Sequence, residues 1–314
     1  LRSMTPEIMH QAMSLGKSVT AQEFIDQQFH GPWKLLRNEP FPEQWDTFVA
    51  GAGSEYMFAP LELNKQHLVR EGYSDKNIFV TGGVVVEALE VKRKEKSEKS
   101  VFDLYPQLEH GQWVRVDIHR KENLTPRRFR SIVSGIKQLV EKGYQINFIE
   151  MNATRHALQQ YNLYHEIEKL KARPNFLFTE IWLEYAHVIE FFESQHCFST
   201  LTDSGGVQEE MNIIHKPCMT CRLNTDRPET VNLAHSNFLV PPVSGEAIVN
   251  MVDHLRNNED LYKSMEKAPN IYGSDVAHKM MTIVKGLMDR NEKTFKWSHH
   301  VLNLWDDEDG VSFK

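Results

Sequence analysis

The sequence contains little cysteine, no long apolar run and no surplus of positive charge. Its three cysteines are an odd number, which does not suggest the disulfide framework of a secreted protein. No apolar run approaches the roughly 20 residues that a membrane helix needs, and no signal peptide is visible. The net charge of −7 argues against a broad nucleic-acid-binding surface, because such surfaces use Lys and Arg to neutralise phosphates. We therefore expect a cytoplasmic protein that binds neither nucleic acid nor a membrane.

Two of the cysteines, Cys218 and Cys221, form a C-x-x-C pair in the run KPCMTCR. Such a pair can mark a redox or metal site, but no second pair exists and the segment follows Lys216-Pro217 as a strand would. We predict that both cysteines are core residues of a strand. The 15 histidines show no H-E-x-x-H or similar metal-ligand spacing, so we expect no metal and no other cofactor.

Length and composition are those of an ordinary soluble globular protein. The chain has 314 residues, of which 40% are hydrophobic and 25% charged. A chain of this length can bury a sizeable core, and we expect two compact units rather than one. The protein is long enough to be an enzyme.

After Asn64 the chain alternates between strand-like and helix-like segments, which predicts a doubly wound α/β unit from about Gln66 to Tyr272. A helix within 122–143 has Thr125 as its N-cap, Pro126 at its first position and Gly143 at its end. A further helix is expected at 84–94. The predicted strands are 77–83, 113–119, 144–150, 175–180, 196–202, 217–222 and 237–240.

The two ends of the chain are less regular. The first 65 residues contain helical pieces, one of them starting at SVTAQEF, but no complete βαβ repeat. The mixed charge run at 92–99 predicts a solvated helix end or a linker. From Ser274 an amphipathic helix leads into a tail whose aromatic residues suggest that it docks on the protein.

The stretch LTDSGGVQEEMNII places two glycines between a predicted strand and a predicted helix. At a helix start several backbone N–H groups lack an intrahelical partner, the helix dipole is positive, and glycines allow close approach of an anion. Ser204-Gly205-Gly206 is therefore either an anion site or an ordinary N-cap with a tight turn. His119 and the loop RLNTDRPE (222–229) also follow predicted strands. Because ligands of such units bind beyond the carboxyl ends of the strands, we expect the three clusters to converge on one rim, which favours the anion site.

Five blocks in the same order resemble the UDP-N-acetylglucosamine 2-epimerases of the GT-B fold. They are TDSGGVQEE (202–210), RLNTDRPE (222–229), IHRKEN (118–123), IFVTGGVVVEAL (78–89) and FPEQWDTFVAGAGSEYMFAP (41–60). The resemblance implies a GT-B-like α/β protein whose residues 66–273 form the nucleotide-binding, Rossmann-like C-terminal domain. Residues 1–65 would be the last part of a first Rossmann-like domain with an inserted helical loop, and residues 274–314 a helix and tail packing back toward it.

The resemblance also implies roles for individual residues. Ser204, Gly205 and Gly206 would receive the UDP phosphates, Glu210 the ribose hydroxyls, and Arg227 a phosphate. His119 matches the histidine at the sugar and diphosphate, and Glu43 matches a carboxylate implicated in proton transfer, although Glu43 could instead be a surface acid near a helix start. Glu209 is expected to face solvent. Secondary candidates are Arg120, Glu122, Arg222, Thr225 and Glu229.

The reaction that the resemblance implies converts UDP-N-acetylglucosamine to UDP-N-acetylmannosamine by elimination and re-addition of UDP, for cell-surface polysaccharide biosynthesis. It needs an acid or base at carbon 2 and charge stabilisation for the departing diphosphate. A hydrolysing 2-epimerase that releases N-acetylmannosamine and UDP, a UDP-sugar-binding module without catalysis, and a sugar transferase of the same fold remain alternatives. The implied substrate is a UDP-N-acetylhexosamine, and the implied assembly is a homodimer.

The sequence departs from the family pattern in several places. It starts at LRS, inside a motif that the family reads GLR, so we expect a fragment of a longer protein that lacks most of the N-terminal domain. The alternatives are a separate chain that supplies that domain, or a protein that is no longer an epimerase. Gly83 replaces an Asn, and His235 a common Gly. Trp182 replaces a Pro near the expected uracil pocket, where it could supply a stacking face or close the pocket. The segment Met4 to Glu39 is longer than in most relatives and could cover the cleft or mediate subunit contact.

Overall fold

The computed structural model describes residues 3–36, 43–95 and 97–289. Within these residues the chain divides into two compact units. The larger unit comprises the chain up to Glu39 together with Ala88–Ile271, and the smaller one comprises Pro40–Glu87 together with the chain from Tyr272 onward. In the described part of the chain, no helix has the length and apolar character needed to cross a membrane.

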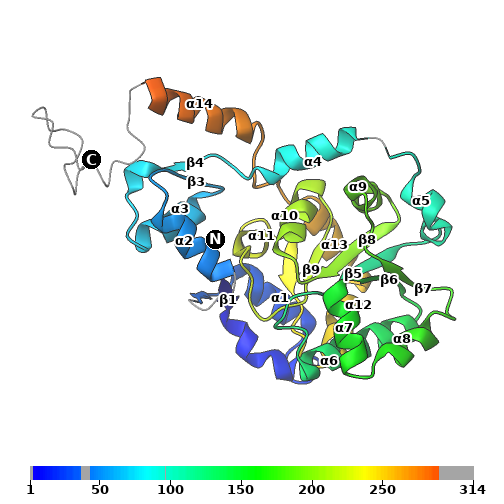
Figure 1. The fold of residues 1–314 in the computed structure, drawn as a ribbon. Coiled ribbons are helices and arrows are strands. Elements are labelled where there is room, and N and C mark those ends of the chain that lie inside the picture. The colour runs from blue at the N-terminus through cyan, green and yellow to red at the C-terminus, as the bar shows by residue number, and fades with distance from the viewer. Residues whose placement is uncertain (1–2, 37–42, 96, 290–314) are drawn as a thin grey trace, which may run out of the picture. The chain divides into compact units, whose positions relative to one another are not determined.

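The larger unit is built on a parallel six-stranded sheet with helices on both faces (Figure 1). Its strands, in spatial order, are β10 (Asn237–Leu239), β9 (Cys218–Thr220), β8 (Cys197–Thr202), β5 (Trp113–Asp117), β6 (Gln145–Glu150) and β7 (Phe176–Glu180). Each strand lies within a segment that the sequence predicted. The chain runs outward from β5 through β6 to β7, then returns to β8 and runs outward the other way to β10. The neighbours β5 and β8 therefore mark the switch point of a doubly wound sheet.

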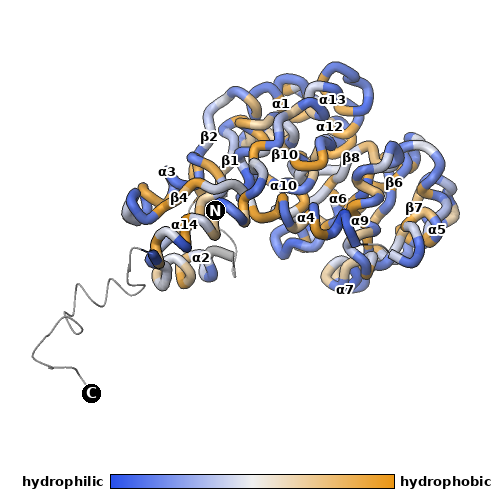
Figure 2. Tube along the Cα trace, turned by 90° about the horizontal axis from the view of Figure 1, so that it is seen from above, coloured by the Kyte–Doolittle hydropathy of each residue, from blue (hydrophilic) through white to orange (hydrophobic). Residues whose placement is uncertain are grey.

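Helices cover the sheet, and two hydrophobic clusters fill the space beneath them. The helices of this unit are α1 (Ala21–His30), α5 (Val101–Leu104), α6 (Pro126–Glu141), α7 (Asn152–Gln160), α8 (Tyr164–Leu170), α9 (Tyr185–Glu193), α10 (Gly205–Ile214), α11 (Pro228–Asn232), α12 (Gly245–Asn257) and α13 (Glu259–Glu266), with 3-10 helices η1 (Glu7–Ser14) and η3 (Pro106–Glu109). Helix α6 starts at Pro126 after Thr125, as predicted. Helices α6 and α12 pack together, and each buries a row of hydrophobic residues. Hydrophobic and hydrophilic stretches alternate along the tube of this unit (Figure 2).

The N-terminal segment adds a short antiparallel ribbon to the larger unit. Strand β1 (Met4–Pro6) pairs with β2 (Trp33–Leu35), and η1 and α1 lie between them. Thr20 caps α1 by accepting a hydrogen bond from the Glu23 N–H, so the predicted helix start is confirmed. The sequence grouped residues 1–65 together, whereas residues 3–36 pack with the larger unit because α1 contacts α11, α12 and β10.

The smaller unit contains a parallel pair of strands, β3 (Met57–Ala59) and β4 (Ile78–Val80). The expectation that the strand at 77–83 joins the large sheet was wrong, because β4 pairs with β3 alone. The helices of this unit are α2 (Glu43–Ala52), α3 (Glu62–Arg70), α14 (Val276–Asp289) and η2 (Asp75–Asn77), while α4 (Val85–Lys94) contains the boundary between the units. The expected tail at 290–314 lies outside the described residues.

A close approach explains why glycine stands at Gly83. Its N–H donates to the Tyr272 carbonyl, and a Cβ at this position would lie 2.9 Å from Cδ1 of the same tyrosine. Any larger residue would push the turn away from this chain segment. The close contact with Tyr272 therefore explains why this chain has glycine where the family usually has Asn.

Candidate functional site

The site lies at the carboxyl ends of β5 and β8, where the direction of winding changes. Asp117 and Thr202 are directly opposite each other in the two strands. His119 follows β5, and Ser204 follows β8. Ligands of doubly wound sheets bind at this switch point, so the fold presents both residues to the expected crevice.

Asp203 connects the two loops. Its buried carboxylate accepts hydrogen bonds from the backbone N–H groups of His119 (3.1 Å) and Arg120 (2.9 Å) and from the Asn123 side-chain amide (3.0 Å). The same Asn123 amide donates to the Cys221 carbonyl (2.7 Å), at the start of the third cluster. Asp203 was not among the residues predicted from the sequence, because the predicted site residues of this stretch begin at Ser204.

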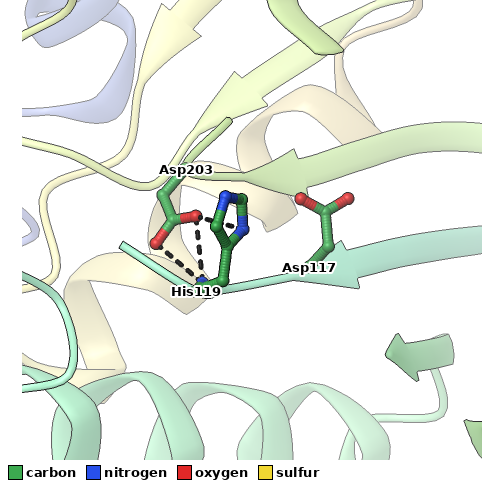
Figure 3. Close-up of side chains that lie close together, drawn as sticks. All are labelled: Asp117, His119 and Asp203. Atoms are coloured by element: carbon green, nitrogen blue, oxygen red, sulfur yellow. Dashed lines mark hydrogen bonds and ion pairs between the residues drawn. The ribbon is translucent and has the colours of Figure 1, made fainter. Parts of the chain in front are cut away.

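The His119 side chain faces Asp203 (Figure 3). Its Nδ1 lies 3.2 Å from Asp203 Oδ1 without the alignment of a hydrogen bond, and about a third of the side chain (32%) is exposed. An imidazole on the rim, fixed through its backbone and facing a carboxylate, is suited to acid–base chemistry on a ligand above it.

Asp117 belongs to a buried polar network under the same rim. Arg115 Nη1 donates to Asp117 (2.8 Å), and the Thr202 hydroxyl also donates to it. Burial raises the pKa of the Asp117 carboxyl, although Arg115 opposes this effect. Asp117, His119 and Asp203 place metal-type ligand atoms within 4.8 Å of one another. Both carboxylates already accept hydrogen bonds from protein donors. We therefore interpret the three residues as a hydrogen-bonded structural network and not as a metal site.

Helix α10 begins as predicted, with Ser204 at the N-cap and both glycines in the first turn. The Ser204 side chain makes no capping bond, so these N–H groups are not satisfied by the usual hydroxyl. The two glycines differ in their surroundings. A Cβ on Gly205 would lie 2.9 Å from the Asp226 carboxylate, whereas a Cβ on Gly206 would meet no atom closer than 4.0 Å. The space at Gly206 is therefore open to a ligand.

The loop 222–229 brings two arginines to this helix start. Arg227 donates to Glu209 (2.6 Å) and to Asp226 (2.9 Å), and Arg222 donates to the other oxygen of Asp226 (2.9 Å). Burial alone would raise the pKa of Asp226, but Arg227, Arg222 and Arg120 together hold it at about 2. Asp226 is thus an ionised anchor that orients both guanidinium groups, and the sequence had not singled it out.

Glu209 does not face solvent, contrary to expectation. Its side chain is only 13% exposed because it pairs with Arg227. The adjacent Glu210 is half-buried and accepts a hydrogen bond from the Tyr185 hydroxyl. Burial raises the pKa of Glu210, and the Tyr185 hydrogen bond opposes the rise. Neither partner was visible in the sequence, because both lie on other elements.

The secondary candidates divide between buried and accessible positions. Arg222, Thr225 and Glu229 are fully buried, whereas Glu122 is partly exposed and lies 3.7 Å from Arg222 Nη2. The loops around His119 and around Arg227 therefore touch, and the predicted convergence of the three clusters is confirmed. Glu43 is the first residue of α2 in the smaller unit, and its side chain lies outside what the structure describes, so its role stays a prediction.

Trp182 is a core residue and not an exposed stacking face. It is 6% exposed, stacks on Tyr105 with centroids 5.8 Å apart, and covers the Arg115 guanidinium. A cavity of about 300 Å³ lies beside it, at the end of β7 and the start of α9. Cys218 and Cys221 are also buried and unpaired, as predicted for core residues, but only Cys218 lies in a strand, because β9 ends at Thr220.

The fold and the site together define a Rossmann-like unit with a glycine-containing helix start at its switch point. Residues 36–285 match the family model described as UDP-N-acetylglucosamine 2-epimerase, and the chain belongs to this family. The UDP-N-acetylglucosamine 2-epimerase of Methanocaldococcus jannaschii is 32% identical over 230 residues, which cover 71% of this chain and 60% of that protein. The Escherichia coli K12 enzyme is 28% identical over 247 residues, covering 76% and 62%.

Solved structures agree with this assignment. The crystal structure of the M. jannaschii enzyme in complex with UDP-GlcNAc and UDP has a TM-score of 0.65 at 29% identity, over 78% of this chain and 64% of that one. The Neisseria meningitidis enzyme bound to UDP-GlcNAc has a TM-score of 0.68 at 25% identity, over 80% and 66%. The fold is therefore GT-B-like, and the chain spans about 60% of the length of the curated relatives.

Proposed function

We propose that the whole protein is a UDP-N-acetylglucosamine 2-epimerase that converts UDP-N-acetylglucosamine to UDP-N-acetylmannosamine. The observation that carries the proposal is the meeting of His119, the start of α10 and Arg227 at one switch point. Family membership supports it, as do the UDP-GlcNAc and UDP named in the M. jannaschii complex.

The departing diphosphate would bind at Ser204, Gly205 and Gly206. The N–H groups and dipole of α10 favour an anion there, and the open space at Gly206 lets a phosphate oxygen approach the backbone. Arg227 supplies a positive charge that Glu209 and Asp226 hold in place, and a charged donor makes a stronger contact with phosphate than a neutral one does. These groups stabilise the charge that develops as the bond between carbon 1 and UDP breaks.

Inversion also requires a proton to leave carbon 2 and to return on the opposite face. In the elimination step a base takes this proton, the electron pair forms the carbon 1–carbon 2 double bond, and UDP leaves with the electrons of the carbon 1–oxygen bond. We assign the proton transfers to His119 on the rim and to Glu43. In re-addition, a proton is delivered to the other face of carbon 2 and UDP attacks carbon 1.

The nucleoside would lie along the same edge of the sheet. Glu210, held by Tyr185, would accept hydrogen bonds from the ribose hydroxyls. The cavity of about 300 Å³ beside Trp182 would take the uracil ring, with Trp182 as part of its wall. Its lining combines apolar and aromatic side chains with Glu180 and Glu184, and a pocket with apolar walls and a few polar groups suits a nucleoside base.

The reaction is tested by incubating the full-length protein with UDP-N-acetylglucosamine in deuterated water and following carbon 2 by NMR. Deuterium at carbon 2 of a sugar that still carries UDP supports the proposal. Release of free N-acetylmannosamine and UDP identifies a hydrolysing enzyme instead. UDP binding without either product would refute an epimerase and leave a binding module or a transferase.

Two variants test the residue assignments. Arg227→Ala should raise the Kd for UDP by about 10- to 100-fold, because it removes a charge-assisted contact of roughly 1.5–3 kcal/mol, and Arg227→Lys should fall between. Arg130→Ala, an exposed arginine on α6, makes the same change of charge elsewhere and should leave the Kd unchanged. His119→Asn should abolish deuterium incorporation while UDP still binds. An unchanged Kd in Arg227→Ala would sink the phosphate assignment.

The family resemblance further suggests a cytoplasmic homodimer with the domain boundaries expected from the sequence, at 65/66 and 273/274. Sedimentation velocity of the full-length protein tests the dimer. Limited proteolysis tests the boundaries, since cleavage between domains is expected in exposed linkers.

A further inference from the structure

The N-terminal segment, residues 3–36, forms a closed substructure on the larger unit. Strands β1 and β2 pair at its two ends, and Leu36 N–H donates to the Ser3 carbonyl (2.8 Å), so entry and exit are held together. The match to the family model begins only at residue 36. The segment therefore lies almost wholly outside the matched region, and its contacts indicate a role.

Strand β1 is bonded to the loop that carries Arg227. Met4 N–H donates to the Thr225 carbonyl (2.8 Å), and Thr225 N–H donates back to the Met4 carbonyl (2.9 Å). The Thr5 hydroxyl donates to the Leu223 carbonyl (2.7 Å), and the Asn224 amide donates to the Ser3 hydroxyl (2.5 Å). Ser3 and Thr225 are fully buried, so these bonds are shielded from water. Three consecutive loop residues, 223 to 225, are thus each hydrogen-bonded to β1 or to the residue before it.

Thr225 passes this restraint to the anion site. Its hydroxyl donates to Gln208 on α10 (2.6 Å) and accepts from the Arg227 N–H (2.9 Å). The backbone of Arg227 is therefore fixed against the helix whose N-terminus would hold the diphosphate. Its guanidinium group is fixed separately, by Asp226 and Glu209.

The other side of the segment is anchored to the edge of the sheet. Gln28, fully buried on α1, donates to the Leu239 carbonyl (3.0 Å) and accepts from the Leu239 N–H (2.6 Å). Its amide thus satisfies peptide groups that the edge strand β10 would leave unpaired. Phe29 stacks on His235 with centroids 4.7 Å apart. His235 has a φ of +56°, which explains why the family commonly has glycine here, and the stacking compensates for this backbone strain.

We propose that residues 3–36 are a positioning element of the UDP site: β1 holds the loop 222–229 in the form that presents Arg227 to the diphosphate. The inference rests on the function proposed above. A loop that is already ordered binds its ligand without a further loss of backbone entropy. Loosening it lowers the fraction of binding-competent protein, and the apparent Kd rises by the inverse of that fraction.

The test removes restraints from β1 without touching the anion site. Thr5→Val keeps the shape of the side chain but loses the hydroxyl, leaving the Leu223 carbonyl without this donor, while Thr5→Ser keeps the bond. Met4→Pro removes the N–H that donates to Thr225. We expect the Kd for UDP, measured by calorimetry, to rise about threefold to tenfold in Thr5→Val and at least as much in Met4→Pro, and to stay within twofold in Thr5→Ser.

A control separates positioning from general destabilisation. Ile167→Val, in the buried face of α8, should lower stability by a similar amount, and α8 lies in the connection between β6 and β7, which β5 and β8 separate from β9 and the loop after it. Amide exchange at residues 223–227 should accelerate in Thr5→Val and Met4→Pro and not in Ile167→Val. An unchanged Kd in both β1 variants, or an equal rise in Ile167→Val, would overturn the inference. If the unaltered protein does not bind UDP, the proposed function itself is refuted, and the positioning role falls with it.

Discussion

Asp203 offers a sharp test of the proposed site. We expect its replacement to lower stability and to weaken UDP binding, which are not the effects expected from replacing a surface acid near a diphosphate. The structure has it fully buried, accepting from the backbone of His119 and Arg120 and from Asn123. Asp203→Asn keeps one carbonyl oxygen, which can still serve Arg120 and Asn123. The new amide nitrogen would then face the His119 N–H, which would keep only its longer bond (3.2 Å) to the remaining oxygen.

The cost follows from these contacts. The His119 N–H loses the shorter of its two bonds to Asp203, and the three donors that stay on the remaining oxygen lose their ionised acceptor, which weakens each bond by roughly 1 kcal/mol. We expect a fall of about 3 kcal/mol in the free energy of unfolding, measured with urea. Asp253→Asn is the matched control, because Asp253 pairs with Lys142 and Tyr144, which lie before the amino end of β6 and so at the other end of the strands from the site. It should cost about 1 kcal/mol or less.

UDP binding gives a second readout with a definite sign. Removing a negative charge near a diphosphate would by itself tighten binding. We expect weaker binding in Asp203→Asn, because the loop that presents His119 and Arg120 loses its anchor. A loss of stability below about 0.5 kcal/mol, or a tighter complex, would refute the reasoning.

Other predictions concern the glycines and a histidine. Gly205→Ala should lower stability by about 1–3 kcal/mol in urea, because its methyl must displace the Asp226 carboxylate, whereas Gly206→Ala should fold normally and weaken UDP binding in calorimetry. Burial, helped by His30, lowers the pKa of His235 below its usual value. The unfolded chain therefore binds the proton more readily, so stability is full above pH about 6.5 and declines as the pH falls through the lower, folded-state pKa. His235→Gly should reduce the loss of unfolding free energy between pH 7.5 and 5.5, and an unchanged slope would contradict this account.

Local signals in the sequence predicted the sheet strands and helix starts well. The β-branched run at 113–119 became β5, and Thr125 with Pro126 marked the start of α6. The order of the blocks also indicated the fold and family that the comparisons show. These features depend on neighbours in the chain, which a single sequence displays.

Pairings between distant residues could not be read in this way. The short strand β4 carries no sign of which sheet it joins, and Gln28 lies 211 residues from its partner Leu239. Asp203 acquires its role only because β8 lies beside β5, which brings it to the His119 loop. An acid at the carboxyl end of a strand was the available signal, but it needed the strand order to become informative.

The carboxylates beside the arginines explain how the site is prepared for an anion. Asp226 and Glu209 would seem to oppose a diphosphate, and they do reduce the positive potential around Arg227. They also hold the guanidinium group in one orientation, and the low pKa of Asp226 keeps this restraint at any physiological pH. With the loop backbone fixed by β1 as well, both the charge and its direction would be set before UDP binds at the proposed site. The site therefore gives up some electrostatic attraction for preorganisation, which is the more effective arrangement where charge develops only in the transition state.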